Sequence, residues 1–110
     1  MTADSDESSE PPSMVAHLMS SCCQPGRCQD YIESYRKWIV PFARSSLGYR
    51  GMYLLTDRES GKALALSLWD TEGDALTYEH SLANMPHLTH PDDALVMPVQ
   101  TDMYEVSEQA

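Results

Sequence analysis

The sequence predicts a single α+β domain with the ferredoxin-like element order βαββαβ. Three observations favour this fold class: two segments with helical spacing of apolar residues, four short segments rich in strand-forming residues, and turn residues between them. The length of 110 residues is typical of one domain. Hydrophobic residues at 42% and charged residues at 22% are the proportions of a chain that folds around one core.

The N-terminal end differs in composition from the rest. Residues 1–13 combine acidic residues, serine and proline without apolar periodicity, so we expect a disordered acidic tail followed by a folded domain at 14–110. An apolar-rich run at 14–21 predicts the first strand, and the Gln-Pro-Gly turn at 24–26 ends it.

The first helix is predicted from a stripe of large apolar side chains at steps of four, three and four, which Ile32 and Ile39 widen: Tyr31, Tyr35, Trp38 and Phe42. Pro41 cannot donate a backbone hydrogen bond. We therefore expect the helix to kink there, or to stop near residue 39 and resume through residue 44.

The remaining elements follow in order. Residues 48–57 and 62–70 read as an antiparallel hairpin, and Thr71 has the position of an N-cap for the second helix. The buried stripe of that helix is expected to comprise Ala75, Tyr78, Leu82 and Met85. A loop is expected at 84–93 and a last strand at 99–106.

The two hairpin strands are apolar on both faces. Met52 and Leu54 point one way while Tyr53 and Leu55 point the other, and the second strand repeats this pattern with leucines opposite small residues and a tryptophan. Two helices cover only one face of a sheet. We therefore predict a homodimer in which a second copy covers the other face, as in a dimeric α/β barrel.

Charge and cysteine content exclude several classes. The net charge of −10 argues against nucleic acid and anionic membrane as partners, because phosphate binding needs lysine and arginine. No signal peptide is recognisable at the start, so we expect a cytoplasmic protein. Cys22, Cys23 and Cys28 are expected to be free thiols, and no cysteine and histidine pattern predicts a metal site.

Several segments carry a family likeness: QPGR at 24–27, GYRGMYLLTDR at 48–58, SGK at 60–62, LSLW at 66–69 and Thr71-Glu72. With the long helix after the first of them, they resemble the antibiotic biosynthesis monooxygenase family across about residues 14–106. The resemblance implies a homodimer with facing sheets and a pocket in each subunit between helices and sheet.

The same resemblance implies a reaction class. Some members oxidise polycyclic aromatic substrates with dioxygen and without metal or flavin, and these use a tryptophan and an asparagine on one strand. Trp69 matches that tryptophan, but Ala65 stands where the asparagine is expected. Other members degrade haem with a helix histidine, for which His80 is a counterpart, but the first strand offers His17 and Ser20 rather than their asparagine.

We therefore expect a monooxygenase that needs no cofactor and acts on a polycyclic aromatic or polyketide-type substrate. His80 is the candidate general base, because an imidazole titrates near neutrality, and Trp69 and Tyr53 complete the expected catalytic group. The expected substrate-binding residues are Trp38, Tyr35, Met52, Tyr78, Met85 and Arg50.

Three other functions stay open: a non-redox polyketide cyclase or aldol-type enzyme, a dimeric binding protein without catalysis, and a haem-degrading monooxygenase. Each aromatic candidate also has an ordinary structural explanation, since aromatic stripes at helical spacing usually belong to the core.

Overall fold

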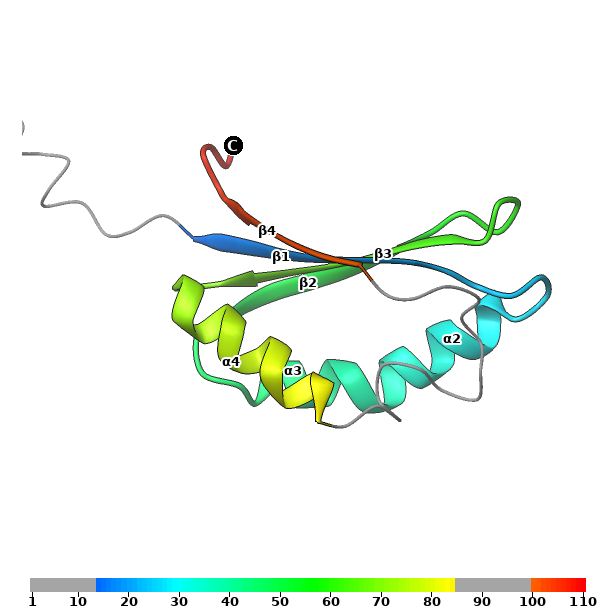
Figure 1. The fold of residues 1–110 in the computed structure, drawn as a ribbon, viewed down its shortest axis with the longest axis horizontal. Helices are drawn as coiled ribbons and strands as arrows, with labels where there is room; N and C mark the ends of the chain where they lie inside the picture. Colours follow the sequence, from blue (N-terminus) through cyan, green and yellow to red (C-terminus); the bar gives the residue numbers. More distant parts are fainter. Residues whose placement is uncertain (1–13, 85–99) are drawn as a thin grey trace, which may run out of the picture.

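One layer of helices packs against one face of a four-stranded sheet (Figure 1). The computed structural model describes residues 14–84 and 100–110, so the tail expected at 1–13 and nearly all of the loop expected at 84–93 lie outside the described part. Within it, β1 (Val15–Cys22), β2 (Tyr49–Thr56), β3 (Lys62–Trp69) and β4 (Gln100–Glu105) pair in the order β2-β3-β1-β4. All three pairings are antiparallel, which confirms the ferredoxin-like order.

The first helical segment runs without a break through α2 (Cys28–Ser34), a π-helical turn η1 (Tyr35–Ile39) and α3 (Val40–Arg44). Pro41 has no N–H, and its ring crowds the carbonyl one turn earlier. The wider π turn directly before it keeps the helix continuous where an α-helical turn would conflict with the proline.

The π turn also corrects the predicted buried stripe. It takes up more residues per turn than an α-helix, so the inward phase moves on by one position and Ile39 faces the sheet instead of Trp38. Trp38 is 47% exposed, with the ammonium of Lys37 over its ring at 5.1 Å. The prediction that Trp38 belongs to the inward stripe was wrong for this reason.

The second helix, α4 (Glu72–Ala83), begins where the sequence indicates. The hydroxyl of Thr71 accepts a hydrogen bond from the backbone N–H of Asp74 at 3.0 Å, and Ala75, Tyr78 and Leu82 form its buried side. α4 packs against β1 and β3, while α3 lies nearer β2. No helix within residues 14–84 or 100–110 is long and apolar enough to span a membrane.

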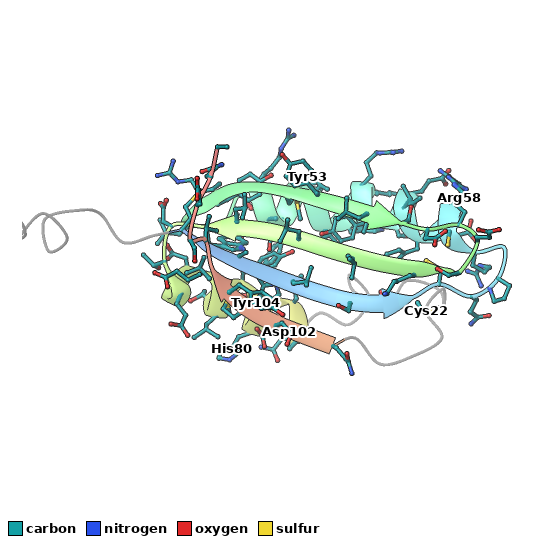
Figure 2. The ribbon with its side chains drawn as sticks, turned by 90° about the horizontal axis from the view of Figure 1, so that it is seen from above. Cys22, Tyr53, Arg58, His80, Asp102 and Tyr104 are labelled. Atoms are coloured by element: carbon teal, nitrogen blue, oxygen red, sulfur yellow. The ribbon has the colours of Figure 1, made fainter. Side chains whose placement is uncertain are left out.

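The opposite face of the sheet is bare of helices (Figure 1). Its central leucines on β3, at positions 64, 66 and 68, are half-buried, while Tyr53 and Leu55 on β2 and Tyr104 on β4 are 60%, 49% and 54% exposed. Figure 2 looks onto this outer face, with Tyr53 and Tyr104 on the two edge strands. The prediction that both faces of the hairpin are apolar is confirmed.

Candidate functional site

The inner face of the sheet and the helices enclose a cluster of aromatic rings. Tyr78 of α4 lies at its centre, with ring centroids 4.6 Å from Trp69 and 5.9 Å from Phe42. Tyr49 meets Trp69 edge-on at 5.9 Å. Trp69 has no exposed surface, and its indole N–H donates to Ser67 Oγ at 2.9 Å. Trp69 and Tyr78 are therefore shielded from solvent, while Phe42 and Tyr49 are partly buried, and the one polar group of the indole is satisfied inside the cluster.

A histidine borders this cluster. His17 of β1 is 1% exposed, and its ring meets Tyr78 edge-on at 5.7 Å. Its Nε2 lies 3.1 Å from Oε1 of Glu79, which α4 places next to Tyr78 in the chain. Nδ1 is also buried and has no hydrogen-bond partner in the part of the chain that the structure describes.

The pairing with Glu79 defines the state of the imidazole. Burial lowers the pKa of His17 below its usual value of 6.5, and the hydrogen bond and charge of Glu79 oppose this only in part. A neutral ring that donates from Nε2 to the carboxylate presents Nδ1 as a free acceptor. Positioned in this way, Nδ1 can take a proton, as the imidazole of a histidine and carboxylate pair does in acid–base catalysis.

The buried tyrosines are the opposite case. Burial raises the pKa of Tyr31 to about 12, and it raises the pKa of Tyr35 and Tyr78 further. These phenols are therefore neutral at ordinary pH, and their rings belong to the buried core.

A groove lies between the first helical segment and β2. Its volume is about 220 Å³, and it is lined by Ile32, Tyr35, Arg36, Val40, Met52 and Leu54. Tyr35 belongs to the same buried core as Trp69 and Tyr78, so the groove borders the core that contains the ring cluster. Two of the residues expected to bind substrate, Tyr35 and Met52, thus come together here.

Other expected site residues lie elsewhere. Tyr53 lies on the outer face of the sheet and Trp69 on the inner face, because neighbouring strand residues alternate between faces. His80 is exposed, and Figure 2 shows it at the margin of the molecule. Met85 lies outside the described residues. The structure therefore does not gather all the expected residues around one cavity.

Arg50 sits at a bulge of the edge strand β2. Tyr49 and Gly51 oppose consecutive residues of β3, which leaves Arg50 unpaired in the ladder. Its guanidinium forms an ion pair with Asp70, and both side chains are largely exposed. Arg50 thus closes the β2–β3 corner and does not reach the groove lining.

The three cysteines meet near the turn between β1 and α2. Cys23 and Cys28 are buried, Cys22 is half-exposed with Sγ 3.5 Å from the carbonyl of Ser60, and all three are free thiols. Burial raises the pKa of Cys23, and its thiol neighbours Cys28 and Cys22 add to this. Among residues 14–84 and 100–110, no group of three cysteine, histidine or carboxylate side chains is arranged to hold a metal ion.

Sequence reasoning missed His17 as a site residue. Its signal was present, because a histidine alternates with apolar residues on a strand predicted to face the helices. The partner could not be found in the sequence, since 62 positions separate it from Glu79.

Comparison with solved structures adds a fold assignment. A protein assigned to the antibiotic biosynthesis monooxygenases from Bordetella bronchiseptica superposes with a TM-score of 0.71 at 18% identity, covering 84% of this chain and 96% of that one. A second such protein, from Nitrosomonas europaea, has a TM-score of 0.72 at 11% identity, with 87% and 92% covered. This chain has the fold of the antibiotic biosynthesis monooxygenases.

A third neighbour is SnoaB from Streptomyces nogalater, described as a cofactor-independent oxygenase. Its TM-score is 0.70 at 13% identity, with 88% of this chain and 96% of that one covered. No protein-family model and no curated protein matches the sequence. At these identities the likeness establishes the fold alone.

Proposed function

We propose that this protein is a homodimeric monooxygenase that needs no metal or flavin and acts on an ionisable aromatic or polyketide-type substrate. The observation that carries the proposal is the buried His17, whose Nε2 is held by Glu79 and whose Nδ1 has no partner within the described residues. The fold it shares with SnoaB supports the same reaction class.

The chemistry requires a base in a dry site. An activated methylene next to a phenol or enol loses a proton, and the resulting anion is electron-rich enough to reduce dioxygen directly. One oxygen atom enters the substrate and the other leaves as water, so the methylene group and dioxygen give a carbonyl group and a water molecule. His17 accepts the proton at Nδ1 and returns it to the departing oxygen.

The ring cluster supplies the second requirement. Trp69 and Tyr78 exclude water from the side of the imidazole on which they lie, which favours transfer to oxygen over loss of the reactive anion to solvent. Solvent hardly reaches His17 in this structure. The substrate must therefore replace part of the packing around the imidazole when it binds.

The test measures oxygen uptake and quinone absorbance with a reduced anthrone as substrate. We expect His17→Gln to lower kcat/KM by roughly 100-fold or more, because general-base catalysis contributes about that much. His80→Gln is the matched control, since His80 is an exposed histidine one residue after Glu79 and should leave the rate unchanged.

Other outcomes separate the alternatives. Conversion of a polyketide-type substrate without oxygen uptake would identify a cyclase or aldol-type enzyme. Tight binding of the anthrone without any turnover would identify a binding protein. Oxygen uptake that His17→Gln leaves intact would contradict the role of His17.

A further inference from the structure

The groove between the first helical segment and β2 has the character of a ligand site in its own right. Five of its six lining residues present carbon surface, and one, Arg36, presents a charge. Its volume of about 220 Å³ lies below the roughly 300–1,000 Å³ typical of pockets for drug-sized ligands. A ligand of one or two fused rings matches this size.

The π-helical turn supplies two of the residues that line the groove, Tyr35 and Arg36. Tyr35 and Arg36 are its first two residues; Tyr35 is 6% exposed and Arg36 is exposed. A buried ring therefore forms the floor and a guanidinium the rim at adjacent positions of the chain. π turns inside helices frequently occur at functional sites.

Arg36 differs from three other arginines in having no ion pair or hydrogen bond to a side chain of the described residues. Arg27 pairs with Asp30 and Arg50 with Asp70, while Arg58 donates to Gln29. No carboxylate of the described residues forms an ion pair with Arg36, although the chain has 17 acidic residues and a net charge of −10. An unpaired guanidinium beside an apolar groove suits a ligand that brings its own anion.

We propose that this groove binds small aromatic carboxylates of one or two rings. The ring lies on Tyr35, Met52 and Leu54, and the carboxylate accepts hydrogen bonds from the Arg36 guanidinium. This inference rests on the proposed oxygenase function in one respect: it takes the aromatic carboxylate to be part of the substrate. Binding of an aromatic carboxylate at the groove is argued from the groove's geometry alone.

The test compares two probes of equal shape, 2-naphthoate and its neutral amide 2-naphthamide, by isothermal titration calorimetry on the full chain. We expect 2-naphthoate to bind more tightly than 2-naphthamide, and its affinity to fall as salt is raised. Arg36→Gln should weaken 2-naphthoate about fivefold and leave 2-naphthamide unchanged, as for a partly exposed ion pair.

Two further variants locate the site. Arg44→Gln removes another exposed arginine from the same helical segment but outside the groove lining, and it should change neither affinity. Ile32→Trp fills the groove from its rim and should abolish binding of both probes. Equal affinity of the two probes, equal effects of the two arginine substitutions, or binding that survives Ile32→Trp would overturn the inference.

The two proposals fail independently. Naphthoate binding that depends on Arg36, without oxygen uptake from anthrones, leaves the groove assignment intact and removes the oxygenase. Oxygen uptake that depends on His17, with no preference for the anionic probe, leaves the oxygenase intact and removes the groove assignment.

Discussion

At the scale of single residues, His17 is the side chain whose environment is hardest to explain by packing alone. An apolar residue at this strand position would fill the space without burying a nitrogen that has no partner among residues 14–84 and 100–110, which is a costly arrangement in a protein interior. Within these residues, Glu79 satisfies one of the two ring nitrogens. The free nitrogen is what a base needs and what a purely structural residue avoids.

The same burial predicts a pH dependence of folding. The folded-state pKa of His17 is lowered by desolvation, so the unfolded state binds a proton more readily. The contribution of the neutral His17 to the free energy of unfolding is complete above pH 6.5, the pKa of an unfolded histidine. It is lost as the pH falls from there through the lower pKa of His17 in the folded state. Urea unfolding at pH 7.5 and 5.5 should show a smaller loss for His17→Gln than for the parent.

His80→Gln again serves as the control, because it removes an exposed histidine of α4 and leaves His17 and its pairing with Glu79 in place. Among the described residues, the groups that face His17 are Glu79 and Tyr78 from α4, Ser67 from β3 and Met103 from β4, and Glu79 is the only carboxylate of this set. A pH dependence identical in parent and His17→Gln would show that another group governs it.

Some of the site was predictable from single residues, and some was not. Tyr35 and Met52 lie on inward-facing positions and both line the groove, while their role in substrate binding stays a prediction. Tyr53 was placed with them although its strand neighbours alternate between faces, and the structure puts it on the outer face. The type of a residue suggested what it could do in a site, but the pairing of the strands was needed to tell which residues lie on the same face of the sheet.

At the scale of elements, the strands were predicted within a residue or two because alternation and turn residues act locally. The phase of the first helix was not, because a π turn before Pro41 rotates everything after it. An α-helical period of 3.6 residues predicts Trp38 inward, and the wider turn brings Ile39 there instead. Sequence periodicity assumes one helix type throughout, and this segment combines two.

The corner where β2 begins yields an element-scale prediction. Gly48 has φ of +85°, and an added Cβ would overlap the side chain of Asp74, including its Cβ at 2.8 Å. Gly48 also accepts a hydrogen bond from Asp70 N–H at 2.8 Å, which ties the start of β2 to the end of β3. Gly48→Ala should lower the free energy of unfolding by about 2 kcal/mol or more, measured by urea denaturation.

Gly26→Ala is the matched control for that measurement. Gly26 has a similar φ of +77°, but an added Cβ meets nothing within 4 Å. The control should cost about 1 kcal/mol, the strain of the left-handed backbone alone. Equal losses at the two positions would mean that the contact with Asp74 adds nothing.

At the scale of the whole molecule, the outer face of the sheet, which no helix of the described residues covers, leads to a prediction about the state of assembly. On this face, leucines of the central strands β1 and β3 lie beside Tyr53 and Leu55 of β2, and the apolar area reaches β4 at Tyr104, next to the exposed Asp102 (Figure 2). Apolar surface of this continuity marks an interface. A second copy is the occupant that the sequence pattern predicts, because an isologous contact buries the same face of both chains.

Light scattering at micromolar concentration should therefore give about twice the chain mass of 12.3 kDa. Leu66→Lys places a charge at the centre of the outer face, where a buried ammonium without a partner costs on the order of 2 kcal/mol or more, and should shift the protein toward monomer. Leu76→Lys tests the specificity of that effect, since Leu76 is a leucine of α4, 38% exposed on the helical side of the molecule. A parent that is monomeric, or a Leu76→Lys variant that dissociates as readily as Leu66→Lys, would rule out the outer face as the contact between copies.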